Sequence, residues 1–118
     1  MALTLNEITE KLNLTLLTEK IDFTEIPVKS GYCSDLLSCV MTGAEPEGLW
    51  ITLMSHSNIV AVAALLDLAA IIITEDAQPD QETIDKANDK GVIMLSSPEP
   101  NYEIIGRLWE LGLKATKH

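Results

Sequence analysis

Residues 49–73 read LWITLMSHSNIVAVAALLDLAAIII, and this stretch decides the fold. Two short apolar runs, residues 49–53 and 69–73, flank an apolar segment that Ser57 or Asn58 can cap as a helix running to about Leu68. Continuously apolar runs of this length are typical of strands that are buried on both faces of a parallel sheet. The stretch therefore predicts a strand, a helix and a second strand packed together.

The same unit recurs toward the C-terminus. Asp80 follows Pro79 as an N-cap, Gly91 supplies a helix stop, and residues 92–95 form a third apolar run. A last amphipathic helix follows Pro100 and ends at Gly112; its expected apolar face comprises Ile104, Ile105, Leu108, Trp109 and Leu111. Parallel strands need crossover connections, so the repeated units predict a three-layer α/β/α fold with a mainly parallel sheet.

The N-terminal half carries weaker signals. Thr4 and Glu7 have capping-box spacing, and Asn13 can end the short helix that they begin. Residues 14–29 are rich in Thr, Leu, Ile and Val and predict one or two short strands broken by Pro27.

Between this region and residue 49 the sequence predicts a loop and one more helix. The loop covers residues 29–32. The helix has Ser34 or Asp35 as its cap and Gly43 as its stop. Residues 114–118 are expected to be a frayed tail.

Length and charge limit the possible functions. The 118 residues are 47% hydrophobic, enough for one core, and we expect a single domain over residues 1–118. Eighteen acidic residues against eight basic ones give a net charge of −10, and no basic cluster is present, so neither nucleic acid nor a membrane surface is an expected partner. No leader or spanning segment is visible, which predicts a cytoplasmic protein.

The two cysteines, Cys33 and Cys39, have neither zinc nor redox spacing. On one shared helix they would lie too far apart for a disulfide, and we expect ordinary buried or half-buried thiols.

Candidate ligand-binding residues follow the predicted strands, because ligands of parallel sheets bind beyond the carboxyl ends of the strands. These residues are Ser55, His56, Ser57, Asn58, Thr74, Glu75, Asp76 and Ser96. The helix start after His56 favours an anion, whereas Glu75 and Asp76 oppose one.

Catalytic chemistry has little support in the sequence. His56 with Asp76 and Glu75 would suit a metal or proton transfer, but no second histidine lies nearby. No cysteine or serine has a recognisable pairing with histidine, and neither a Walker loop nor G-x-G-x-x-G occurs. We expect a protein that is not an enzyme and has no metal or cofactor.

The stretch from Gly48 to Leu113 resembles the DRTGG domain, especially residues 49–52, residues 71–74, Pro79-Asp80, Ala87 and Gly91. It is also similar to the N-terminal domain of HPr serine kinase/phosphorylase and to the module in CBS-regulated pyrophosphatases. The signature itself is replaced. Ser55-His56 stands where the family often has Asp-Arg, and Glu75-Asp76 follows Thr74 where it has Gly-Gly.

The resemblance implies a non-catalytic regulatory or protein-interaction module that forms a homodimer. It also implies a protein partner such as a redox or hydrogenase-associated subunit. A small-molecule sensor, for example of nucleotides, binding at the strand-end loops is the alternative. The apolar helix over residues 58–68 either offers a dimer face or lies under the N-terminal segment of its own chain.

Overall fold

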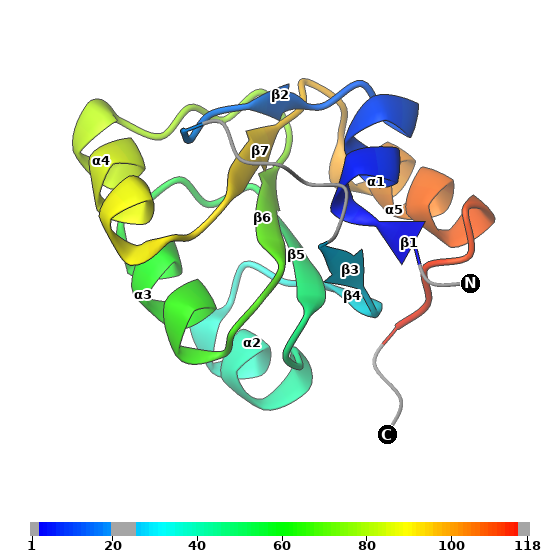
Figure 1. Ribbon diagram of the computed structural model, residues 1–118, viewed down its shortest axis with the longest axis horizontal. Coiled ribbons are helices and arrows are strands. Elements are labelled where there is room, and N and C mark those ends of the chain that lie inside the picture. Colours follow the sequence, from blue (N-terminus) through cyan, green and yellow to red (C-terminus); the bar gives the residue numbers. More distant parts are fainter. Residues whose placement is uncertain (1–2, 20–25, 116–118) are drawn as a thin grey trace.

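The computed structural model describes residues 3–19 and 26–115 and shows an α/β fold in three layers (Figure 1). The central sheet has five strands in the order β2-β7-β6-β5-β4. Four of them run parallel, and β2 pairs antiparallel with β7 at one edge. The strands are β2 (Thr15–Leu16), β4 (Ser30–Cys33), β5 (Gly48–Thr52), β6 (Ala70–Ile73) and β7 (Met94–Ser96). The predicted α/β fold with a mainly parallel sheet is confirmed.

Helices cover both faces of the sheet (Figure 1). The three crossover helices, which pack on one face, are α2 (Leu37–Gly43), α3 (Asn58–Leu65) and α4 (Gln81–Lys90). The opposite face is covered by α1 (Leu5–Lys11) and α5 (Asn101–Glu110). Beside α1, β1 (Leu3–Thr4) pairs antiparallel with β3 (Pro27–Val28).

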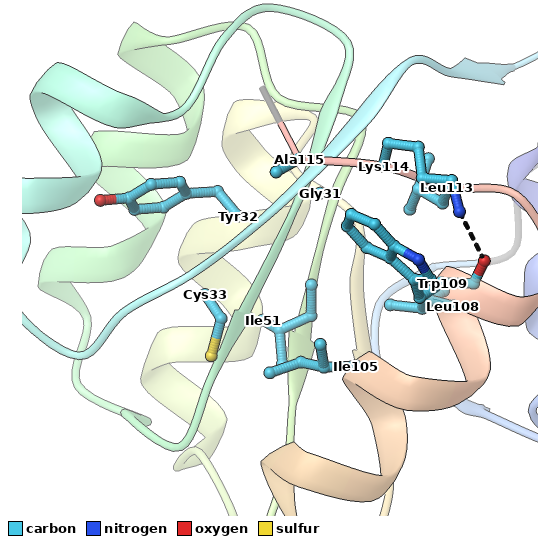
Figure 2. Close-up of a pocket in the computed structure, with 10 residues that line it drawn as sticks. All are labelled: Gly31, Tyr32, Cys33, Ile51, Ile105, Leu108, Trp109, Leu113, Lys114 and Ala115. Carbon is cyan, nitrogen blue, oxygen red and sulfur yellow. Dashed lines mark hydrogen bonds between the residues drawn. The ribbon is translucent and has the colours of Figure 1, made fainter. Parts of the chain in front are cut away.

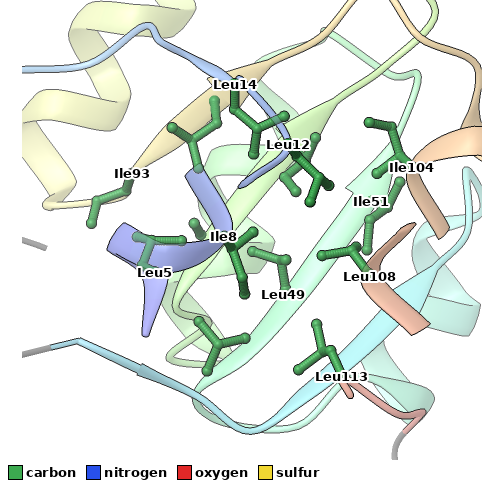
Figure 3. Close-up of a cluster of buried hydrophobic side chains, with 14 residues drawn as sticks. Leu5, Ile8, Leu12, Leu14, Leu49, Ile51, Ile93, Ile104, Leu108 and Leu113 are labelled. Atoms are coloured by element: carbon green, nitrogen blue, oxygen red, sulfur yellow. The ribbon is translucent and has the colours of Figure 1, made fainter. Parts of the chain in front are cut away.

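The core is divided by the sheet into two clusters, because successive residues of a strand point to opposite faces. Leu49, Ile51 and Ile72 join α1 and α5 in one cluster (Figure 3). Trp50 and Ile71 join α2, α3 and α4 in the other. Every residue of β5 and β6 is buried, as their continuous apolar sequence predicts.

Several predicted helix boundaries are confirmed. Thr4 and Glu7 form the capping box at the start of α1, and Asn13 adopts a left-handed conformation just past its end. The Asp80 carboxylate accepts a hydrogen bond from the Thr83 amide at the start of α4, and Gly91 ends that helix with φ +72°.

The predicted loop over residues 29–32 is wrong, because Ser30–Cys33 form the edge strand β4. Ser and Gly are poor strand formers, so the local sequence favoured a loop. Parallel pairing with β5 supplies the hydrogen bonds, and Leu113 packs against the strand at Gly31. The predicted strand region yields β2, at the other edge of the sheet, and β3, which pairs with β1 and begins at Pro27; residues 20–25 lie outside the described part.

One predicted cap is wrong, and another is at its predicted position without a side-chain bond. Leu36 occupies the N-cap of α2 without a side-chain bond, since the Asp35 carboxylate turns toward β5 and the Ser34 hydroxyl accepts from the Leu36 amide. Ser57 occupies the N-cap of α3 without a side-chain bond, and His56 Nδ1 accepts from the Asn58 amide instead.

The apolar helix is shorter than predicted and has different neighbours. It ends at Leu65, before Asp67, which has φ +54°. It packs beside α2 and α4, whereas α1 lies on the opposite face of the sheet, so the N-terminal helix does not cover it. Leu65 remains 67% exposed. No helix in the described ranges is long and apolar enough to cross a bilayer.

Candidate functional site

The carboxyl ends of the four parallel strands lie together at one end of the sheet. We call this end, which is distinct from the edge strands β2 and β4, the C-terminal edge. The loop after β6 leads to α4 on one face, and the loop after β7 leads to α5 on the other. Connections that leave neighbouring strands toward opposite faces open a crevice, and this is where open α/β sheets bind ligands. Thr74, Glu75 and Asp76 belong to the first of these loops.

Hydrogen bonds join these two loops to each other. The Glu75 amide donates to the Glu99 carbonyl at 2.9 Å, and the Asp76 amide donates to the Ser97 carbonyl at 3.3 Å. The Asn101 amide, at the start of α5, donates to Glu75 Oε2 at 2.9 Å. A carboxylate of the chain itself therefore sits at the start of α5, whereas the sequence suggested an anion at the start of α3, after His56.

A row of polar side chains runs across the same edge. Thr52 Oγ1 donates to Asp35 Oδ1 at 2.6 Å, and that carboxylate also accepts from the Leu53 amide at 3.0 Å. Thr74 Oγ1 bonds to the Thr52 carbonyl and to Asn101 Oδ1. Both threonines are fully buried. The row therefore ties α5 and the β4–α2 connection to the ends of β5 and β6.

His56 lies apart from this row. Its side chain is exposed, and its Nδ1 is engaged by the Asn58 amide at 3.1 Å. In the described structure no hydrogen bond or ion pair joins His56 to Glu75 or Asp76, and no group of three metal-ligating side chains is present. The pKa of Asp80, at the start of α4, is lowered mainly by the hydrogen bonds of Thr83 and to the smallest extent by His56.

The remaining predicted residues lie on the same edge without joining the polar row. Ser55 and Ser57 are half-buried, and Asn58 is exposed at the first position of α3. Ser96 ends β7, paired in register with Thr15 and Ile73. The structure therefore brings Thr74 and Glu75 into contact with Asn101. The other predicted residues lie at the same end of the sheet but outside this group.

A pocket that the sequence did not predict lies between β4 and α5 (Figure 2). It has a volume of about 230 Å³ and ten lining residues: Gly31, Tyr32, Cys33, Ile51, Ile105, Leu108, Trp109, Leu113, Lys114 and Ala115. Ile105 and Trp109 are 37% and 53% exposed. The sequence carried one sign of this pocket. The apolar face of α5 is wider than the core needs, because only Ile104 and Leu108 of this helix are buried.

Cys33 borders this pocket. It is exposed and free, so the expectation of a buried or half-buried thiol is wrong for it, while Cys39 is half-buried on α2. Partial burial of the thiol and the neighbouring Asp35 carboxylate raise the pKa of Cys33, which makes it a weaker nucleophile at neutral pH.

No protein-family model and no curated protein matches the sequence. Among solved structures, the fold is similar to the CBS and DRTGG domains of the regulatory region of Clostridium perfringens pyrophosphatase, complexed with its activator diadenosine tetraphosphate. The TM-score is 0.73 and the identity 18%; the alignment covers 97% of this chain and 50% of that chain. This likeness supports the predicted DRTGG-like fold, while the similarity to HPr kinase stays a prediction.

The backbone directly after Thr74 is left-handed. Glu75 and Asp76, which stand where the predicted resemblance would place Gly-Gly, have φ +59° and +60°, a conformation that glycine adopts without a steric penalty. Asp76→Gly is therefore expected to raise the free energy of unfolding by about 0.5–1 kcal/mol. Urea denaturation measures this change. Asp89→Gly, inside α4, is the matched control and should not raise it, because glycine is a slightly poorer helix former than aspartate, by about 0.3 kcal/mol.

An Asp76→Gly protein less stable than the unmodified one would contradict a left-handed backbone at this position. Glu75→Gly is a poorer test, because it also removes the carboxylate that accepts from the Asn101 amide.

Proposed function

We propose that the chain is a non-catalytic regulatory module of DRTGG-like fold that acts by association and forms a homodimer. The observation that carries this proposal is the C-terminal edge, where the chain's own side chains and amides are bonded to one another. The Glu75 carboxylate engages the start of α5, and the buried Thr74 hydroxyl is bonded on two sides.

The chemistry at this edge agrees with a role in binding. The acidic side chains there, among them Asp35 and Glu75, accept hydrogen bonds from backbone amides and so act as structural anchors. In the part of the chain that the structure describes, no carboxylate bonds to His56. The site therefore lacks the carboxylate that commonly orients a histidine for general base catalysis.

Large apolar side chains surround the same edge. Leu36, Leu53 and Tyr102 are 60%, 43% and 92% exposed, and we call them the edge surface. The polar row holds them in place, because Asp35 binds the Leu53 amide beside Leu36, and Asn101 precedes Tyr102. Apolar side chains gathered on a surface are typical of protein contacts. A second copy of the chain is the partner that we propose for this surface.

The structural neighbour supports a regulatory role, since its domains belong to the regulatory region of a pyrophosphatase. The protein partner of redox or hydrogenase type remains a prediction from the family resemblance. A nucleotide at the strand-end loops also remains a prediction. Such a ligand would have to displace the Glu75 carboxylate from the Asn101 amide, and no lysine or arginine lies in these loops to compensate.

Charged substitutions on the edge surface test the proposal. Sedimentation velocity across a wide concentration range should show a dimer for the unmodified chain. Leu36→Glu combined with Tyr102→Glu should weaken self-association at least about tenfold, because each carboxylate would be buried unpaired in the interface. Both sites are exposed in the single chain, so folding should be unaffected.

Leu65→Glu is the matched control, since Leu65 is equally exposed but lies at the far end of α3. It should leave the dimer intact. If only Leu65→Glu dissociates the dimer, the interface is the face of α3. A monodisperse monomer at every concentration would reject the homodimer.

A further inference from the structure

The pocket between β4 and α5 is separate from the edge surface and is built by three parts of the chain. The floor is formed by β4 and β5, one wall by α5, and the other wall by residues 113–115 (Figure 2). The last wall is held in place, since the Gly31 amide donates to the Lys114 carbonyl at 2.9 Å and Gly31 forms a parallel bridge with Ala115. The expected frayed tail is therefore ordered up to residue 115; residues 116–118 lie outside the described part.

The size of the pocket limits what it can hold. Its volume is about 230 Å³. A cavity of about 150 Å³ holds a benzene molecule, whereas drug-sized ligands occupy about 300–1,000 Å³. The space therefore suits one aromatic ring with a short side chain and excludes a nucleotide.

The lining is apolar with a single charged side chain. Ile51, Ile105 and Leu108 present aliphatic groups, and Trp109 contributes an indole ring. Lys114 Nζ donates to the Trp109 carbonyl at 3.3 Å and lies 4.1 Å from the centre of the Trp109 ring. An ammonium group has three donors, so two of them are left for a ligand.

The charge of Lys114 is not neutralised by the protein. In the described part of the chain the only salt bridge joins Lys29 and Glu47, and Lys114 has no carboxylate partner. An uncompensated cation at the mouth of an apolar pocket is complementary to an anion that carries an apolar body.

We propose that this pocket binds a small arylalkyl monocarboxylate. The ring lies against Ile105 and Trp109, and the carboxylate accepts hydrogen bonds from Lys114 Nζ. Binding covers the half-exposed indole and joins α5 to the terminal segment that pairs with β4. This inference goes beyond the proposed function and does not depend on dimer formation.

Phenylacetate and 3-phenylpropionate are suitable probes, with phenylacetamide as the uncharged counterpart. Trp109 lies at the site, whereas Trp50 is fully buried on the other face of the sheet, so a fluorescence change reports on the pocket. The acids should bind saturably with a Kd of about 1 mM or below. Phenylacetamide should bind about tenfold more weakly, because it lacks the charge-assisted bonds.

Substitutions of Lys114 distinguish a specific binding site from nonspecific binding. Lys114→Met keeps the aliphatic stem and should weaken phenylacetate binding about tenfold. Lys114→Arg should bind nearly as the unmodified chain does. Lys86→Met removes an exposed charge of the same sign on α4 and should change nothing. Unfolding midpoints should be alike in all three variants, which shows that each is folded.

Two results would overturn the assignment. The first is that the site does not recognise the carboxylate. Either phenylacetate shows no saturable binding up to about 10 mM, or phenylacetamide binds as tightly as phenylacetate and Lys114→Met binds phenylacetate as tightly as the unmodified chain does. The second is binding only upon dissociation of a dimer, seen by sedimentation in saturating phenylacetate, which would mean that a second copy fills the pocket. The first result leaves the test of the edge surface unaffected. The second would place the dimer interface at the pocket, and Leu36→Glu combined with Tyr102→Glu would then leave the dimer intact.

Discussion

Replacing Trp50 with alanine is expected to lower the free energy of unfolding by about 3–5 kcal/mol. The side chain is fully buried in the middle of β5, in the cluster beneath α2 and α3. Its Nε1 donates to the Ser34 carbonyl at 3.0 Å, which fixes the connection between β4 and α2. The substitution removes the largest buried side chain and a hydrogen bond together, and the surrounding sheet can close the cavity only in part.

Urea denaturation followed by circular dichroism measures this loss. Trp109→Ala is the matched control, because Trp109 is 53% exposed and should cost at most about 1 kcal/mol. Trp50→Phe retains most of the volume and should fall between the two, which keeps the test informative if the alanine variant does not fold. Equal losses at both tryptophans would contradict the burial of Trp50.

The central strands and their helices were predictable because each carries its own signal. The apolar runs of β5 and β6 are buried on both faces, so their pattern does not depend on knowing their partners. The boundaries of α1 and α4 were predictable for a similar reason. A capping box at Thr4 and a left-handed glycine at Gly91 act within a few residues of sequence.

Elements that depend on distant contacts were not predictable. The strand β4 consists of Ser, Gly, Tyr and Cys and exists because β5 pairs with it and Leu113 packs on Gly31. Asp35 looked like a helix cap, but its carboxylate is more strongly engaged by Thr52 and the Leu53 amide, 17 and 18 residues away. Local propensity cannot anticipate such competition between partners.

The candidate site shows the same division. Placing Thr74, Glu75 and Asp76 at the carboxyl ends of the strands required only the order of strands and helices. That Glu75 would accept from the Asn101 amide, 26 residues later, required the two loops to meet in three dimensions. The pocket beside Trp109 was missed because α5 and the terminal segment form it only after both have packed against β4.

Thr74→Val is expected to lower the free energy of unfolding by about 1–3 kcal/mol, although the two side chains have nearly the same shape. The Thr74 hydroxyl is fully buried and bonds to the Thr52 carbonyl and to Asn101 Oδ1. Valine leaves Asn101 Oδ1 without this bond in a place that water reaches poorly, whereas the Thr52 carbonyl still accepts from the Thr74 amide at 2.9 Å. The start of α5 then depends on the Glu75 carboxylate alone.

Two measurements distinguish this local effect from a general loss of stability. Urea denaturation gives the free energy, and hydrogen exchange of the Asn101 amide reports the opening of the helix start. Thr42→Val is the matched control: its hydroxyl is exposed and donates to carbonyls within α2, so the change should stay within about 0.5 kcal/mol. If Thr74→Val matched Thr42→Val in both measurements, the polar row would not hold α5 in place. The edge surface that we propose for the dimer would then lack its support, because Tyr102 follows directly on Asn101.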